Sequence, residues 1–206
     1  MRYKIGAVFM VMGAALILSA LLLLINNEKE ASSAEQAVAD LLPQLIQEIQ
    51  LQQEEAGVNA GDLNVPAQLL QPSAFEMTEV EINGYGYIGY LNIPSIELEL
   101  PVMSEWDYDR LKISPCRYTG SVKGEDLVIM AHNYAMHFGQ LKALSEGDEV
   151  IFVDMDGNVI HYEVKAKDIL DPTAIEEITS GDFDLTLFTC TYGGAQRVTV
   201  YCDQVK

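Results

Sequence analysis

The chain has 206 residues, enough for one domain of ordinary size with an additional segment and too few for two large domains. Its 31 acidic and 12 basic side chains give a formal net charge of −19, which argues against a nucleic-acid partner because phosphate binding needs a basic surface. Three cysteines are too few for a disulfide scaffold. Yet 49% of the residues are hydrophobic and the mean hydropathy is +0.10, so apolar and acidic residues have to lie in different parts of the chain.

Residues 1–25 are typical of a short tail followed by a membrane anchor. Residues 5–25 form 21 consecutive positions without a charge, and such a helix spans the hydrocarbon core of about 30 Å. The alternative is a cleaved secretory signal, but small residues that suit cleavage come only after Glu30. Because Arg2 and Lys4 precede the span and an acidic flank follows it, we expect a cytoplasmic N-terminus and an extracellular chain from about Asn26.

Residues 26–82 are acidic, with eleven carboxylates against one basic residue, Lys29. Apolar residues recur with a helical period over about residues 33–55, and Pro43 is expected to kink or restart that helix. Glycine, asparagine and two prolines predict a linker over residues 57–72. The preferred interpretation is a solvated helical stalk, and the alternative is a helix that packs on the domain behind it.

Residues 83–206 carry the pattern of a β-domain. Asp156-Gly157 between two alternating segments predicts a tight hairpin turn. One helix is expected within residues 137–145 and a second helical turn within 173–180. Seven or eight short strands in about 120 residues favour a closed β-barrel. The clearest predicted strands cover residues 87–94, 96–102, 126–132, 149–154, 159–169, 185–190 and 197–202.

Three residues with suitable chemistry lie at strand ends. Cys190 and His132 each end an apolar strand, and Arg197 begins the strand that follows Cys190. A thiol nucleophile, an imidazole acid–base and a guanidinium facing a developing oxyanion together suit acyl transfer. Without further context, however, a single cysteine is more often a small buried apolar residue.

The motifs around these residues resemble those of sortases. The segment TLFTC at 186–190, with Arg197 seven residues later, is similar to the TLxTC…R signature of that family. The resemblance covers about residues 85–202 and implies a mainly β fold, a closed sortase-type barrel with one or two short helices. Further similar segments are IGYLNIPSIELELPV at 88–102, RYTGS at 117–121, IMAHNY at 129–134 and HFGQLKAL at 137–144.

The resemblance implies a membrane-anchored cysteine transpeptidase at the surface of a Gram-positive cell. Cys190 would attack an LPxTG-like sorting motif of a secreted protein and form a thioester, which an amine of a peptidoglycan precursor resolves. His132 would protonate the leaving amine and deprotonate the incoming one, while Arg197 steadies the substrate or the oxyanion. Thr189 and Asn133 are expected to bind substrate or support the site.

Other assignments stay open. The alternatives are a sortase-like thiol peptidase that mainly hydrolyses and a non-catalytic, membrane-tethered binding domain. The HN…HFG…L arrangement and the N-terminal helical extension lean towards class B, whereas residues 169–185 are short for that class. The absence of a second apolar span after Cys202 argues against the pilus-building class.

No cofactor is expected from the sequence. The spacing of His132 and His137 does not suit zinc, and His137 and His161 are expected to be structural or surface residues. Cys116 and Cys202 are expected to be buried thiols, with a disulfide between them as the alternative. Some sortases bind calcium near the loop before the nucleophile strand, and carboxylates suit that ion, although a solvated acidic loop is preferred. The carboxylates concerned are Glu176, Glu177, Asp182 and Asp184.

Overall fold

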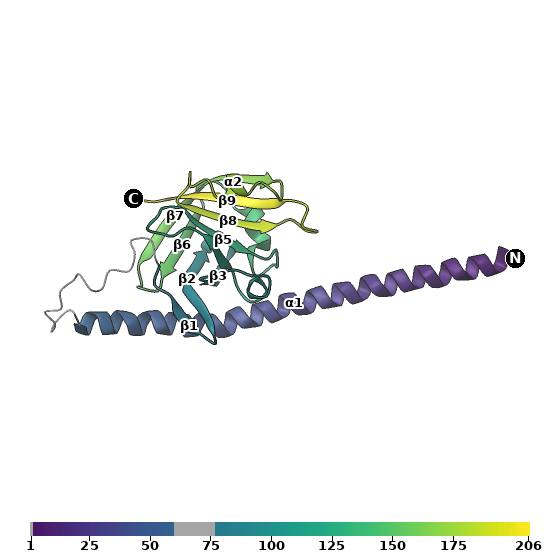
Figure 1. Ribbon diagram of the computed structural model, residues 1–206, viewed down its shortest axis with the longest axis horizontal. Coiled ribbons are helices and arrows are strands. Elements are labelled where there is room, and N and C mark those ends of the chain that lie inside the picture. Colours follow the sequence, from purple (N-terminus) through teal and green to yellow (C-terminus); the bar gives the residue numbers. More distant parts are fainter. Residues whose placement is uncertain (1, 60–76) are drawn as a thin grey trace.

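The computed structural model describes residues 2–59 and 77–206, which form a long helix and a β-barrel (Figure 1). Helix α1 covers Arg2–Asn59, and most of the predicted linker, from residue 60 onward, lies outside the described residues. The strands begin at β1 (Val80–Ile82), within the acidic region that precedes residue 83. The division of the chain at residues 25 and 82 therefore stays a prediction, with β1 already part of the sheet.

Eight strands close into a barrel. The hydrogen-bonded order is β1-β2-β3-β4-β5-β8-β9-β7-β6, and β6 also pairs with β2, so β2 to β9 form a ring and β1 flanks it. The predicted closed barrel is thus confirmed. Its strands are β1 (Val80–Ile82), β2 (Tyr85–Ile93), β3 (Leu98–Met103), β4 (Cys116–Thr119), β5 (Leu127–Ala131), β6 (Glu149–Asp154), β7 (Val159–Leu170), β8 (Leu185–Cys190) and β9 (Arg197–Gln204).

The connections are short and follow the local sequence. The hairpin between β6 and β7 has Gly157 at a φ of +79°, as a tight turn requires. Both predicted helical segments are present, the first as a 3₁₀ helix. The short helices are η1 (Pro94–Ile96), η2 (Arg110–Lys112), η3 (Phe138–Ala143) and α2 (Ile175–Ile178).

Strand β8 runs through the centre of the sheet, between β5 and β9. Leu185 and Leu187 belong to the barrel core, whereas Phe188 packs in a separate cluster with Val128 and Ile178 on the outer side. Because both faces of the strand are covered, its sequence is a continuous apolar run rather than an alternating one. This burial fixes the strand up to Cys190, which is half-buried at its end.

Helix α1 packs against the barrel. One of its faces is buried around Leu45, which is 0% exposed, and this face contacts Tyr87 and Met103 of the sheet. The free stalk is therefore replaced by the alternative interpretation, a helix that packs on the domain. The buried residues of this face are Ala34, Val38, Leu41, Leu45 and Ile49.

Helix α1 continues through Pro43, so the proline does not restart the helix, and the alternative of a kink stays a prediction. Leu41 before it and Leu45 after it are buried against the same surface of the barrel. A proline inside a helix removes one backbone hydrogen bond and costs about 3 kcal/mol. Burial of two leucine side chains contributes a comparable amount, about 1.5–3 kcal/mol each, and holds the helix on both sides of Pro43.

The N-terminal part of α1 extends beyond the barrel (Figure 1). From Val8 to Ile25 its large apolar side chains are exposed, and the helix is long and apolar enough to cross a membrane. The loop between β8 and β9 points towards the same end of the molecule as the N-terminus of α1 (Figure 1). The end of the barrel that carries Cys190 and Arg197 therefore faces the apolar part of the helix.

Candidate active site

Strand register brings Cys190, His132 and Arg197 together. In the antiparallel pair of β8 and β9, Cys190 lies directly opposite Arg197. In the parallel pair of β5 and β8, Ala131 lies opposite Thr189, so His132 and Cys190 both occupy the next position along neighbouring chains. Side chains at opposed positions of a sheet lie about 5 Å apart at Cβ. The three predicted residues thus share one end of the barrel.

All three line one groove of about 210 Å³. Trp106, Tyr118 and Phe188 give it a largely apolar and aromatic wall, and the rings of Trp106 and Tyr118 lie 5.4 Å apart. Tyr118 in turn meets Phe188 edge-on at 5.4 Å. A small groove with apolar walls and three polar groups at its base suits a short extended peptide whose backbone is attacked at one carbonyl.

The two supporting residues take different places. Thr189 lines the groove, and its buried hydroxyl donates a hydrogen bond of 2.8 Å to the Ala131 carbonyl. This bond joins the residues that precede Cys190 and His132. Asn133 does not line the groove but lies in a neighbouring cavity.

His132 is held in a partly buried position. Burial lowers the pKa of its imidazole below the usual value, the Glu30 carboxylate opposes this shift, and the Lys112 ammonium adds to it. A neutral imidazole can accept a proton from a thiol. The His132 carbonyl accepts a hydrogen bond of 3.0 Å from the Phe138 N–H. The loop closes tightly at Gly139, where a Cβ would lie 2.6 Å from the Asn133 carbonyl oxygen.

Arg197 is oriented by its own loop. Its Nη1 donates hydrogen bonds of 3.2 Å to the carbonyls of Gly194 and Gln196. A guanidinium carries five N–H donors in a planar fork, and these contacts use one nitrogen only. The group is therefore fixed while keeping donors that can face an oxyanion in the groove.

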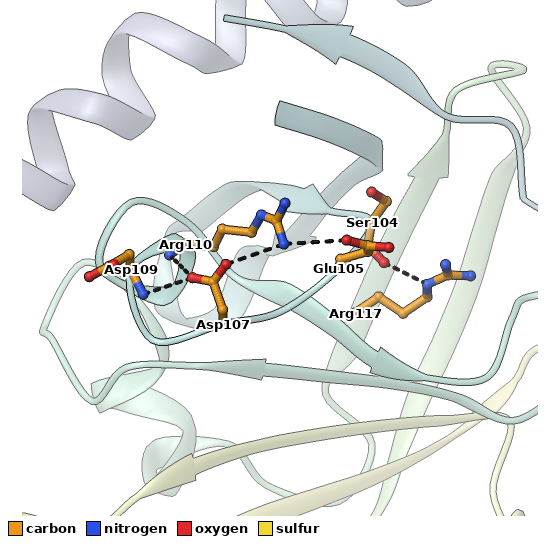
Figure 2. Close-up of polar contacts among 6 residues, drawn as sticks. All are labelled: Ser104, Glu105, Asp107, Asp109, Arg110 and Arg117. Carbon is orange, nitrogen blue, oxygen red and sulfur yellow. Dashed lines mark hydrogen bonds and ion pairs between the residues drawn. The ribbon is translucent and has the colours of Figure 1, made fainter. Parts of the chain in front are cut away.

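The loop between β3 and β4 is stabilised by a polar network (Figure 2). The Asp107 carboxylate accepts hydrogen bonds of 2.8 Å from the backbone N–H groups of Asp109 and Arg110. Arg110 Nη1 lies between carboxylates, 3.3 Å from Glu105 and 3.2 Å from Asp107 (Figure 2). At the start of the loop, Arg117 Nε donates to the Ser104 carbonyl at 2.9 Å.

This network surrounds two residues of the groove. Trp106 and Tyr108 form an edge-on pair with ring centroids 6.1 Å apart, and both line the groove. The two rings therefore form an aromatic pair on this loop. The position of this pair beside Cys190 was not predicted, because Trp106 packs on Tyr118 of β4, and Tyr118 in turn packs on Phe188 of β8.

The remaining two histidines and two cysteines lie outside the residues that line the groove. His161 Nδ1 lies 2.8 Å from the Glu149 carboxylate on the surface of β6 and β7, whereas His137 is fully buried. Cys116 and Cys202 are buried free thiols. Burial raises the pKa of the Cys116 thiol to about 12, which keeps it protonated and unreactive.

Three of the four carboxylates of the acidic loop before β8, those of Glu176, Glu177 and Asp182, line one surface cavity. Among the side chains described, those of residues 8–54 and 77–206, no three histidine, cysteine or carboxylate groups lie close enough together to hold a metal ion. Asp184 instead accepts a hydrogen bond of 2.7 Å from the Gln204 backbone N–H.

A family model of the sortase domain matches residues 91–205. The chain belongs to the sortase family. Membership implies cysteine transpeptidase chemistry at the level of the family, in agreement with a groove that holds a cysteine, a histidine and an arginine. No curated protein matches the chain significantly.

Solved sortase structures share the fold. Sortase C from Clostridium perfringens SM101 is 25% identical, with a TM-score of 0.53 over 88% of this chain and 96% of that one. A Streptococcus pneumoniae sortase C is 23% identical, with a TM-score of 0.56 over 83% and 97% of the two chains. A lid mutant of sortase A from Corynebacterium diphtheriae is 24% identical, with a TM-score of 0.52 over 58% and 70%. Since sortases A and C are both among these structures, the lean towards class B stays a prediction.

Replacing Asp107 by alanine should weaken peptide binding. Its backbone hydrogen bonds, first the one from the Arg110 N–H, lower the pKa of the Asp107 carboxyl and keep it charged while it fixes the loop. Loss of this order should raise KM for a sorting peptide roughly three- to tenfold with little change in kcat. Steady-state kinetics on the full-length protein in detergent would measure both. Asp109→Ala, which removes only an exposed ion pair with Lys112, should leave KM unchanged; equal effects would contradict this role.

Barrel stability should fall in mild acid because of His137. Neither ring nitrogen has a hydrogen-bond partner in the described part of the chain, and burial, then the charge of His132, lowers its pKa from 6.5 to about 4. Between pH 4 and pH 6.5, His137 therefore binds a proton in the unfolded chain but not in the folded barrel. The free energy of unfolding is therefore full above about pH 6.5 and falls as pH approaches 4, by about 3 kcal/mol in total.

Urea unfolding followed by fluorescence of Trp106, the single tryptophan, would measure this loss. His137→Leu should flatten the acid dependence, apart from the smaller contribution of His132, which has the same sign. His161→Gln, at an exposed surface pair, should retain it. If the free energy of unfolding of His137→Leu depends on pH as steeply as that of the wild type, other groups cause the loss of stability in acid.

Proposed function

We propose that this protein is a membrane-anchored sortase that cleaves an LPxTG-like motif of secreted proteins and joins them to an amine of a peptidoglycan precursor. The observation that supports this most is the placement of Cys190, His132 and Arg197 in one groove at the ends of β8, β5 and β9. Arg2 and Lys4 before the apolar helix favour a cytoplasmic N-terminus and an extracellular barrel.

In the first half-reaction the neutral His132 takes the proton of the Cys190 thiol. The thiolate attacks the scissile carbonyl, and Arg197 faces the negative charge that develops on the carbonyl oxygen. The carbon–nitrogen bond then breaks, the His132 imidazolium protonates the leaving amine, and a thioester on Cys190 remains.

The second half-reaction reverses these roles. An incoming amine attacks the thioester carbonyl and loses a proton to His132, while the carbon–sulfur bond breaks and Cys190 leaves. The thioester divides one difficult exchange of amide bonds into two easier steps. The apolar wall of the groove around Trp106 and Phe188 limits the access of water to the thioester.

Mass spectrometry of the full-length protein with a library of LPxTG-like peptides tests this function. A transpeptidase should show a thioester on Cys190 and, after addition of triglycine, a joined product. Hydrolysed peptide alone in the presence of triglycine would indicate the thiol peptidase instead. Peptide binding without any thioester would indicate the non-catalytic binding domain and overturn the proposal.

A further inference from the structure

A second, larger cavity of about 730 Å³ lies beside the groove. One wall is α1, with Asn26, Asn27 and Glu30, and the other consists of the two loops that follow β5 and β8. These loops begin directly after His132 and Cys190. The cavity therefore connects the part of α1 next to the membrane span with both halves of the catalytic site.

The cavity and the groove meet at His132. The His132 ring packs on Tyr134 with centroids 4.9 Å apart. His132 lines the groove, while Tyr134 and the adjacent Asn133 line the cavity. A molecule bound in the cavity would thus lie next to the base that deprotonates the incoming nucleophile.

The charge of the cavity is negative. Glu30 is the single charged residue among the described residues that line it, and it forms no ion pair with the side chains of residues 8–54 and 77–206. Asn26 Nδ2 donates a hydrogen bond of 3.0 Å to Glu30 Oε1 and orients the carboxylate. Burial is the first cause and the Glu30 charge the second cause of a raised pKa of the Tyr134 hydroxyl. The Glu30 carboxylate therefore lies close enough to interact electrostatically with the loop that follows His132.

The two ends of the cavity differ in polarity. Ala20, Leu23 and Leu24 line one end and belong to the predicted membrane span, whereas asparagines and Glu30 line the other. The cavity consequently lies where α1 leaves the bilayer. Its lining suits a cationic head group, with apolar surface available for an attached chain.

We propose that this cavity binds the acceptor of the second half-reaction as a primary ammonium, with Glu30 as its counter-ion. The inference rests on the proposed function and assigns it a second substrate site that includes α1. The bound ammonium gives one proton to His132, and the resulting amine attacks the thioester carbonyl. The new carbon–nitrogen bond forms as the carbon–sulfur bond breaks, the second amine proton passes to water, and His132 returns its proton to the Cys190 sulfur.

The test compares Glu30→Gln with Glu35→Gln in full-length protein in phosphatidylcholine vesicles. Glu35 is exposed on the same helix and does not line the cavity. The measured quantity is the ratio of joined to hydrolysed product from one peptide thioester, so changes in acylation rate cancel. The nucleophiles are triglycine, which carries an ammonium, and hydroxylamine, which is largely uncharged at neutral pH.

Glu30→Gln should lower the ratio with triglycine about two- to fivefold, the range expected for an exposed charge pair. Hydroxylamine should show no such loss, and Glu35→Gln should match the wild type with both nucleophiles. An equal loss with both nucleophiles in Glu30→Gln, or no loss with either, would overturn the ammonium site. If wild-type protein forms no thioester with any peptide, the proposed function fails as well, which separates the two failures.

The source of the ammonium is resolved by one further probe, glycine hexadecylamide dissolved in the vesicles. Preference for this amphiphile over triglycine would indicate an acceptor carried by the membrane. Preference for triglycine would indicate a soluble acceptor. Both outcomes support the same ammonium site if Glu30→Gln lowers the yield of joined product from the preferred probe, whereas an undiminished yield in that variant would contradict it.

Discussion

Replacing Cys190 by alanine is expected to abolish both the thioester and the joined product. Cys190 is half-buried at the end of β8, opposite Arg197, and lines the groove with His132. Without its sulfur no covalent intermediate forms, so the loss should exceed about 10³-fold in kcat. Mass spectrometry of the protein with a sorting peptide and triglycine would measure both products.

The matched controls are Cys116→Ala and Cys202→Ala. Both side chains are buried and lie outside the groove, so these variants should keep the thioester while losing about 1 kcal/mol of stability each. A thioester that persists in Cys190→Ala and disappears in Cys116→Ala or Cys202→Ala would assign the nucleophile to another cysteine.

Replacing Arg197 by lysine should lower kcat by about 10²- to 10³-fold, although the charge is kept. The planar guanidinium is anchored by the carbonyls of Gly194 and Gln196, Arg197 lines the groove, and the remaining N–H donors are free to face an oxyanion there. A single ammonium cannot reproduce both contacts. Single-turnover rates of thioester formation would show the loss directly. If Arg197→Lys is nearly as fast as wild type and Arg197→Ala is slow, charge alone is sufficient and the fork geometry plays no part.

Much of the barrel was predictable because its strands have strong local patterns. The apolar run of β8 and the Asp156-Gly157 turn both indicate their structure within a few residues. Strands β1 and β4 were missed, since β1 has three residues and β4 meets β3 through a single pair, Met103 with Cys116. Such short strands depend on their partners and not on their own sequence.

The packing of α1 was not decided by its sequence. Its helical period predicts an apolar face around Leu41 and Leu45, but a period does not show what covers that face. Pro43 suggested an interruption that tertiary contacts on both sides overcome. In both respects the barrel determines the conformation of the helix.

The site was predictable only in part for a similar reason. Cys190 and Arg197 lie close together in the sequence and form a recognisable motif. His132 could be predicted because it ends an apolar strand. Trp106 lies in the groove although it comes about 80 residues before Cys190, and Glu30 of α1 lines the neighbouring cavity although it comes about 160 residues before Cys190. Contacts over such separations depend on topology, which local patterns do not contain.

Because α1 is continuous, the rotation of the barrel relative to the predicted membrane span depends on how many residues separate the two along the helix. The helix passes without interruption from Ile25, at the end of the predicted span, to Ala34, the first buried residue of its barrel-facing side. Each residue of an α-helix adds about 1.5 Å of length and about 100° of rotation. Loss of one residue in this interval would turn the groove about the helix axis by more than a quarter of a circle while lowering it by little more than an atomic radius. The number of residues between Ile25 and Ala34 thus determines which side of the helix axis the groove faces, and so the direction from which a substrate reaches Cys190.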